Sequence, residues 1–229
     1  MSIKENLSNI KDKVNSARIK TGSEKKTKII AVTKTHSPEK IASCIEAGIL
    51  SIGENKIQEA QKKFKKINFP NNFEKHFIGH LQTNKINKCL TLFDFIDSVD
   101  SFRLSSLINK KAENIDKKIP VLLEINICKE ERKKGFFPDQ IEEMLKCFEN
   151  QNILIKGVMT IGPSKGNNKK KREAFQKTRR VFLNLNEQRP SGYPQLTELS
   201  MGMSNDYEIA IEEGSTQVRI GTALLGKRL

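Results

Sequence analysis

Eight short apolar or β-branched runs recur along this chain, and most are followed by a polar junction and a segment with helical periodicity. This regular alternation of strands and helices favours a parallel sheet. Eight is the number of strands that a closed barrel needs, so the sequence predicts an α/β protein with a (β/α)8 TIM barrel. The runs are Ile29–Lys34, Leu50–Gly53, Lys75–Gly79, Phe95–Val99, Val121–Asn126, Ile155–Ile161, Thr197–Met201 and Gln217–Gly221.

Helix signals agree with these strand boundaries. Helix starts are predicted where a capping residue or a proline precedes a suitable first turn, and Gly214 is predicted to stop a helix. The predicted starts are Ser37 followed by Pro38, Asn55 with Gln58 three residues on, Ser101, Pro138 with Asp139, and Ser204, and a short helix is predicted over Thr83–Thr91.

The two ends of the chain are predicted to complete one outer ring of helices. Only Thr222–Leu229 follow the eighth run, too few residues for a full barrel helix, whereas Ile3–Ile19 forms an amphipathic helix before the first run. We expect this leading helix to fill the missing place, and residues 1–229 to form a single domain. The polar, basic stretch Pro163–Lys171 is expected to be flexible. An open doubly wound sheet is the alternative, but residues 34–37 lack its glycine-rich first turn.

Charge and hydropathy narrow the classes of function. The formal net charge of +14 raises the question of nucleic acid. The basic residues follow nearly every predicted helix, and aromatic residues suited to base stacking are few, so we interpret the charge as solvated faces. Residues 1–20 lack the continuous apolar run of a signal peptide or a membrane helix. Neither nucleic acid nor a membrane is expected as a partner.

The cysteines point to a reducing compartment. Cys44, Cys89, Cys128 and Cys147 are far apart and form no C-x-x-C pair, so neither a disulfide framework nor a zinc site is indicated. We expect them to be small buried side chains of a cytoplasmic protein. No cluster of acidic residues indicates a metal.

A barrel places its reactive groups at the carboxyl ends of its strands, so the residues there are the candidates for chemistry. Lys34 ends the first run, and a lysine in that position usually extends its ammonium into water. Beside another cation such as Arg219 in a partly desolvated mouth, its pKa would fall and the amine would become a nucleophile toward carbonyl groups. Its surroundings therefore decide between the two interpretations.

The last two runs end where barrels commonly bind phosphate. Ser200-Met201-Gly202 follows the seventh run and Gly221-Thr222 the eighth, and Ser204 is expected to open a helix whose positive end faces the same anion. The alternative is that these are only turn residues and caps. His80 is expected to line the mouth, and His76 to be a surface or packing residue, because two residues four apart along a strand cannot chelate one metal together.

Five motifs together resemble the pyridoxal phosphate homeostasis protein family over nearly the whole chain. They are Ala31-Val32-Thr33-Lys34-Thr35, Gly53-Glu54-Asn55, the ten residues from His76 to Lys85, Leu199-Ser200-Met201-Gly202-Met203-Ser204, and Val218-Arg219-Ile220-Gly221-Thr222. The chain departs little from the family pattern, with His36 and His80 where relatives often have other residues.

The resemblance implies a fold-type III barrel like the amino-terminal domain of alanine racemase, with pyridoxal 5′-phosphate as the cofactor. It implies that Lys34 holds this cofactor as an aldimine. The other cofactor-binding residues that it implies are Asn55 near the ring, Arg219 near the pyridine nitrogen, and Ser200, Met201, Ser204, Gly221 and Thr222 around the phosphate.

The function implied is binding, buffering and delivery of the cofactor, with enzymes that require it as partners. The alternative is an amino-acid racemase that uses the cofactor, and a nucleic-acid-binding barrel is a more remote one. Racemisation needs a second positioned acid/base group besides the lysine. Neither Tyr193, in a loop, nor Tyr207, in a predicted helix, is placed over the ring. We therefore expect a monomeric binding protein without efficient catalysis and without catalytic residues.

Overall fold

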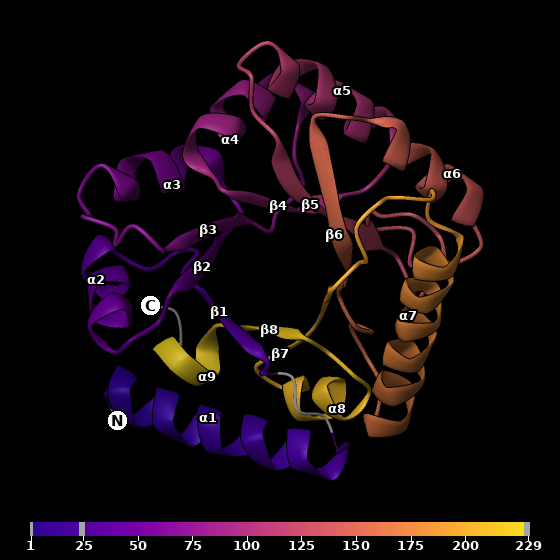
Figure 1. Ribbon diagram of the computed structural model, residues 1–229. Coiled ribbons are helices and arrows are strands. Elements are labelled where there is room, and N and C mark those ends of the chain that lie inside the picture. Colours follow the sequence, from indigo (N-terminus) through magenta and orange to yellow (C-terminus); the bar gives the residue numbers. More distant parts are fainter. Residues whose placement is uncertain (1, 23–25, 227–229) are drawn as a thin grey trace.

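The computed structural model describes residues 2–22 and 26–226, and the strands of this part close into a barrel. Each strand pairs in parallel with the next along the chain, and β1 pairs with β8, as Figure 1 shows in a view down the barrel. The strands are β1 (Lys28–Val32), β2 (Ser51–Glu54), β3 (Glu74–Phe77), β4 (Phe95–Val99), β5 (Ile119–Ile125), β6 (Ile153–Thr160), β7 (Glu198–Met203) and β8 (Gln217–Ile220). The predicted (β/α)8 barrel is confirmed.

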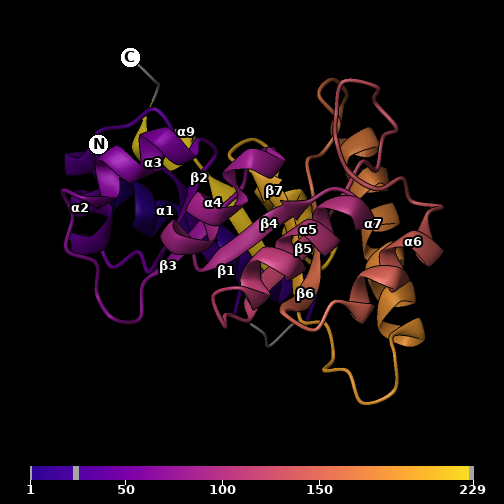
Figure 2. The same ribbon diagram turned by 90° about the horizontal axis from the view of Figure 1, so that it is seen from above.

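Helices surround the barrel, with α1, α2, α3 and α9 on one side and α5, α6 and α7 on the other in the view of Figure 2. They are α1 (Ile3–Lys20), α2 (Pro38–Glu46), α3 (Ile57–Phe64), α4 (Ile86–Leu92), α5 (Phe102–Glu113), α6 (Ile141–Lys146), α7 (Asn168–Gln188), α8 (Tyr207–Glu212) and α9 (Thr222–Leu225), with short 3-10 helices η1 (Thr83–Lys85) and η2 (Cys147–Glu149). The predicted starts at Pro38 and after Ser101 and the stop at Gly214 are confirmed.

The leading helix completes the outer ring, as predicted from the sequence. In Figure 1, α1 runs along the outside of the barrel beside α8 and α9. Its side chains Leu7, Ile10 and Val14 are buried in an apolar cluster that also contains strand residues such as Val218. The side chain of Asn6 donates a hydrogen bond of 2.9 Å to the carbonyl oxygen of Leu224 in α9. A helix from one end of the chain is thereby fixed to the other end.

The barrel is apolar outside and largely polar inside. Ala31, Ile52 and Val218 belong to the cluster beneath α1, and a second, larger cluster packs β4 to β7 against α4 to α7. Side chains alternate along a strand, and Ile30 is the register partner of Arg219. The alternation therefore turns Arg219 to the interior, where it is almost fully buried.

Two helix starts predicted upstream of the observed ones are wrong. Helix α3 begins at Ile57 after Lys56, and Asn55 caps nothing, because its main chain packs against Gly79 instead. Helix α6 begins at Ile141, after the predicted Pro138 and Asp139. The preceding segment is held by a bridge from Phe136 to β5 and by a 2.6 Å hydrogen bond from the N–H of Phe137 to Gln140.

The prediction that Ser204 opens a helix is also wrong. Helix α8 begins at Tyr207 after Asp206. The hydroxyl of Ser204 instead accepts hydrogen bonds from the backbone N–H groups of Gly221 (3.1 Å) and Ala223 (3.2 Å) at the start of α9. The local sequence pattern predicted that this serine caps the helix that follows it. In the structure it instead makes a tertiary contact between the ends of β7 and β8.

Part of the stretch that was expected to be flexible is helical. Asn167 caps α7 by accepting a hydrogen bond from the N–H of Lys170, so the last residues of Pro163–Lys171 are helical. Three of the cysteines, Cys44, Cys89 and Cys147, are buried as expected, and Cys128 is partly exposed.

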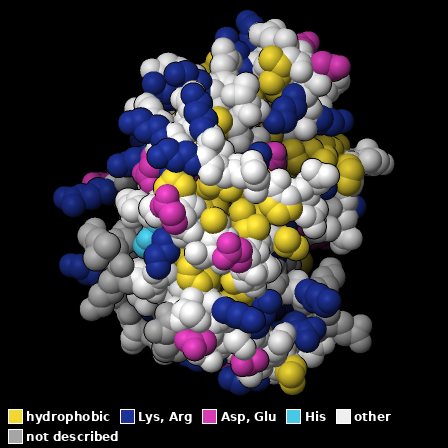
Figure 3. Space-filling view, turned by 90° about the vertical axis from the view of Figure 1, so that its left-hand side faces the viewer, with side chains coloured by type: hydrophobic (Ala, Val, Ile, Leu, Met, Phe, Trp, Pro, Cys, Tyr) yellow, Lys and Arg dark blue, Asp and Glu magenta, His cyan; other side chains and the backbone are white. Residues whose placement is uncertain are grey.

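On the face of the molecule seen in Figure 3, the positive charge is dispersed. Figure 3 shows Lys and Arg side chains scattered over one face, with Asp and Glu among them and apolar side chains across its centre. Among the described residues, no helix is both long and apolar enough to cross a membrane.

Candidate functional site

Lys34 lies at the carboxyl end of the barrel, two residues after β1, and is half-buried. The N–H of Thr33 still donates to the carbonyl oxygen of Gly53 in the β1–β2 ladder (3.1 Å), and the N–H of His36 donates back to Thr33 (3.0 Å). Between these bonds Thr35 adopts a φ of +66°, which few residues with a branched Cβ adopt. The lysine therefore projects from a tight, hydrogen-bonded turn.

Arg219 supplies a buried positive charge in the barrel interior. Its Nη1 donates to Ser200 Oγ (2.6 Å) and its Nη2 to the carbonyl oxygen of Thr160 (2.7 Å), and both of these acceptors are neutral. Burial lowers the pKa of this guanidinium, and the charges of Asp97 and Glu124 act in the other direction. An arginine stays protonated under these conditions, so the interior carries a fixed cation that suits an anionic or electron-rich ligand.

The loops after β7 and β8 meet at the same end of the barrel. The Ser204 hydroxyl joins them through its two bonds from α9, and Thr222 is exposed there. Gly202 has a φ of +95°, and a Cβ on it would lie 2.6 Å from that of Ala210, so only glycine fits. Backbone N–H groups and hydroxyls of this kind are the groups with which barrels hold phosphate.

Met201 stands apart from the other candidates. Its side chain is fully buried in the apolar cluster between the strands and the outer helices. The structure therefore brings Lys34, Arg219, Ser204 and Thr222 to one end of the barrel, but it does not bring the Met201 side chain there.

Asn55 presents a buried acceptor at the end of β2. Its Oδ1 receives no hydrogen bond from the described residues. Gly79 allows this placement, because a Cβ on it would lie 2.4 Å from the carbonyl oxygen of Asn55. Ser98 Oγ fixes the same glycine by donating 2.6 Å to its carbonyl oxygen. A buried polar atom left without a protein partner is a site at which a ligand can bind.

An ion-pair network inside the barrel was not expected from the sequence. Of the two alternatives given for His76, the structure shows the packing residue: it is buried, its ring stacks on Phe95 at 4.5 Å, and its Nδ1 lies 2.9 Å from Asp97 Oδ1. Burial alone would lower the pKa of His76, but Asp97 and Glu74 raise it to about 9. The raised pKa favours the protonated imidazole beside Asp97, a carboxylate whose charge also acts on Arg219.

Glu124, next to this network on β5, was also missed. Burial and the charge of Asp100 raise its pKa to about 7, and Arg219 opposes the rise. The available signal was the alternation along the fifth run, in which Glu124 stands on the opposite face from the apolar residues Leu123 and Ile125.

His80 lies at the rim of the mouth, in line with the prediction. Its side chain is 52% exposed, and Nδ1 lies 3.1 Å from Asp100 Oδ2. Both residues line a pocket among the loops that follow β3, β4 and β5. The described residues contain no group of three His, Cys, Asp or Glu side chains that could hold a metal ion.

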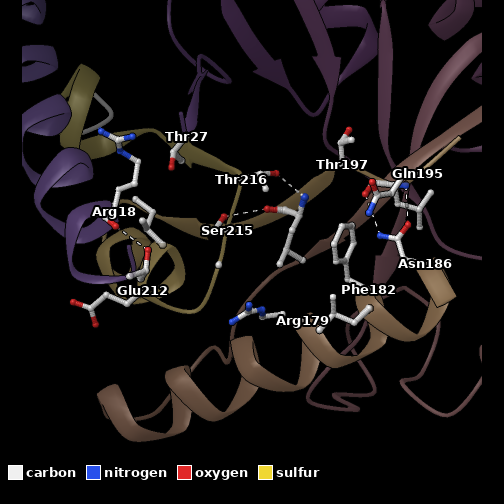
Figure 4. A pocket seen from close by; sticks show the side chains of 16 residues that line it. Arg18, Thr27, Arg179, Phe182, Asn186, Gln195, Thr197, Glu212, Ser215 and Thr216 are labelled. Carbon is white, nitrogen blue, oxygen red and sulfur yellow. Dashed lines mark hydrogen bonds between the residues drawn. The ribbon is translucent and has the colours of Figure 1, made fainter. Parts of the chain in front are cut away.

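Another cavity, of about 350 Å³, lies away from the mouth, where α1, α7 and α8 meet the amino ends of the strands. Figure 4 shows Arg18 and Glu212 on one side of it, Asn186 with Gln195 on the other, and Arg179 below and between them. Asn186 is occupied by reciprocal hydrogen bonds with the backbone of Leu196. None of the candidate cofactor residues lines this cavity.

Comparison with known proteins places this eight-stranded barrel, with its lysine, buried arginine and two hydroxyl-bearing loops at the mouth, in the alanine racemase class. The family model described as "Alanine racemase, N-terminal domain" matches residues 6–228. The chain is 36% identical over 230 residues to the "Pyridoxal phosphate homeostasis protein" of Aquifex aeolicus, with 100% of this chain and 99% of that protein covered. The chain belongs to the pyridoxal phosphate homeostasis protein family.

Solved structures agree with this assignment. PipY of Synechococcus elongatus PCC7942, solved with PLP bound, superposes with a TM-score of 0.86 at 31% identity, with 98% of this chain and 100% of that chain covered. Alanine racemase of Clostridium difficile 630 superposes with a TM-score of 0.71 at 16% identity, with 97% of this chain and 56% of that chain covered. The second likeness shows the fold alone.

Proposed function

We propose that this protein binds pyridoxal 5′-phosphate through a Schiff base to Lys34 and serves in its homeostasis, as a buffer or carrier of the cofactor. One observation carries the proposal. Lys34, the Asn55 oxygen that accepts no hydrogen bond from the described residues, and the buried Arg219 lie with the loops after β7 and β8 at one end of the barrel. The neutral lysine amine would condense with the aldehyde carbon and release one water, so no other reactant is needed.

The residues present fit this cofactor. Its phosphate would be held by the backbone N–H groups of Gly221 and Ala223, which Ser204 now occupies, together with the exposed Thr222 hydroxyl. The resemblance assigns Arg219 to the pyridine nitrogen. The cofactor supplies an electrophilic carbon and an electron-withdrawing ring. A cationic guanidinium beside that ring disfavours its protonation and makes it a poorer electron sink.

The contacts of both tyrosines support binding rather than racemisation. The Tyr193 hydroxyl accepts a hydrogen bond of 2.7 Å from the N–H of Ile155, near the amino end of β6 and away from the mouth. Tyr207 is buried in the cluster beneath α1. Neither phenol is therefore available above Lys34 as the second acid/base group. The alanine racemase structure is related at only 16% identity, and the Aquifex relative at 36% identity carries the name of a homeostasis protein.

The remaining parts of the proposal concern the context of the protein. We expect residues 1–229 to act as one monomeric domain in the cytoplasm and to deliver the cofactor to enzymes that require it. The spread of basic residues along the chain and over the face in Figure 3 supports a protein that does not bind nucleic acid, and the three buried cysteine thiols are compatible with a reducing compartment.

Visible absorbance tests the function. Purified protein mixed with pyridoxal 5′-phosphate should show the absorbance band of a protein-bound Schiff base, and Lys34→Ala should lose it. Lys56→Ala is the matched control, because Lys56 is an exposed lysine in the loop after the neighbouring strand β2. A band that persists in Lys34→Ala and disappears in Lys56→Ala would refute the assignment.

A further inference from the structure

A lysine in the outer layer, Lys63 of α3, is buried with all its hydrogen-bonding capacity used. Its side chain is 6% exposed. The Nζ atom lies 2.9 Å from the carbonyl oxygen of Thr33, 2.6 Å from Glu54 Oε1 and 2.8 Å from Glu59 Oε1. An ammonium has three N–H donors, so each has one acceptor. These acceptors come from the ends of β1 and β2 and from α3.

This cluster holds both peptide groups that flank Lys34. The Thr33 carbonyl belongs to the peptide bond before Lys34, and it accepts from Lys63. The N–H of Thr35 belongs to the peptide bond after Lys34, and it donates to Glu59 Oε1 at 2.5 Å. Since Glu59 also binds Lys63, a single ion pair fixes the orientation of the backbone on both sides of Lys34.

The turn needs such support because Thr35 has a φ of +66°. This region is unfavourable for a residue with a branched Cβ, and it persists only where surrounding contacts impose it. The two hydrogen bonds from the cluster, at the Thr33 carbonyl and the Thr35 N–H, hold the backbone that leads directly into this strained residue.

Both carboxylates of the cluster, those of Glu54 and Glu59, help to fix the backbone around Lys34. Burial would raise the pKa of Glu59, but hydrogen bonds from Lys63 and the Thr35 N–H hold it below its ordinary value. Burial raises the pKa of Glu54, which Lys63 and the Thr33 hydroxyl oppose. Glu54 Oε1 also accepts from Thr33 Oγ1 at 2.6 Å, so the side chain of Thr33 is fixed as well as its carbonyl.

A buried ion pair by itself adds little to stability, because desolvation offsets the attraction between the charges. The role of this ion pair is therefore to orient the backbone groups that it binds. We propose that Lys63 and Glu59 are positioning residues that fix the backbone on both sides of Lys34 and so present its amine to the aldehyde of the cofactor. This inference rests on the proposed function of Lys34.

The test compares two ligands that differ only at the reacting carbon. Pyridoxal 5′-phosphate can react with Lys34, whereas pyridoxine 5′-phosphate carries an alcohol in place of the aldehyde and can only bind. Lys63→Met should raise the dissociation constant of the aldehyde at least tenfold and change that of the alcohol less than about threefold. Lys62→Met, on the exposed side of the same helix, is the matched control and should change neither.

Glu59 provides a second variant pair that does not empty a buried site, since its side chain is 25% exposed. Glu59→Gln keeps an oxygen that can accept from the Thr35 N–H, and Glu59→Ala removes it. We expect the glutamine variant to bind the aldehyde within about threefold of the wild type and the alanine variant to bind it at least tenfold more weakly. If Lys63→Met does not fold, this pair decides the question.

Two results would overturn the inference: aldehyde binding unchanged in both Lys63→Met and Glu59→Ala, or equal weakening of both ligands, which would indicate a merely structural role. Failure of the proposed function itself would look different, because the wild-type protein would then form no Schiff base at Lys34.

Discussion

The buried pair of His76 and Asp97 makes the stability of the protein depend on pH in a way that one substitution should abolish. The pKa of His76 is raised from 6.5 to about 9. Since one pH unit corresponds to about 1.4 kcal/mol, protonation contributes up to about 3 kcal/mol to the free energy of unfolding. This contribution is complete below pH 6.5 and is lost as the pH rises through about 9. His76 also contacts Glu74, whose pKa falls to about 2. This contact is already included in the raised pKa of His76, so it adds no further free energy.

The assay is urea unfolding of the cofactor-free protein at pH 6.5 and at pH 9. His76→Asn keeps a donor for Asp97 but cannot titrate. The loss of unfolding free energy that this substitution causes should be larger at pH 6.5 than at pH 9 by about 2 kcal/mol. His80→Asn is the control, because His80 is half-exposed and also contacts an aspartate. Equal losses for His76→Asn at the two pH values would show that the buried imidazole is neutral and would refute the reasoning.

Three further predictions concern the mouth. Gly79→Ala should destabilise the protein by about 1–3 kcal/mol in urea unfolding and weaken cofactor binding in absorbance titrations, because its Cβ would overlap the backbone of Asn55; an unchanged affinity would remove Asn55 from the site. Replacing the exposed Thr222 by alanine should weaken the binding of pyridoxal 5′-phosphate about tenfold more than that of unphosphorylated pyridoxal, because its hydroxyl is proposed to hold the phosphate; equal losses would place the phosphate elsewhere. Incubation of the loaded protein with L-alanine should give no more D-alanine by chiral chromatography than the free cofactor gives, and accumulation over many turnovers that Lys34→Ala abolishes would establish an enzyme.

The barrel and the positions of its strand ends were predictable because topology maps them to one place. Eight alternating units leave few architectures open, and a closed parallel barrel brings all the carboxyl ends to one rim. Lys34 and Gly221 could therefore be placed on that rim although they are about 190 residues apart, without any knowledge of their contacts.

The remaining features depend on contacts that no local pattern contains. Asn55 and Ser204 both have the sequence signals of helix caps, but the main chain of Asn55 packs against Gly79 and the hydroxyl of Ser204 binds the start of α9. Two further contacts join different elements: His76 pairs with Asp97, and Lys63 binds Thr33. Each of these residues is polar or charged, so the sequence alone suggests that it lies at the surface. Tertiary contacts override local propensity at such places, and they gather around the proposed site.

The most direct test of the proposed function is the location of the covalent bond. The protein loaded with pyridoxal 5′-phosphate is reduced with borohydride, weighed by mass spectrometry, digested and mapped. One reduced cofactor per chain, attached to the peptide that contains Lys34, is the predicted result. Label on Lys56 or Lys85, or label spread over many surface lysines, would contradict the account.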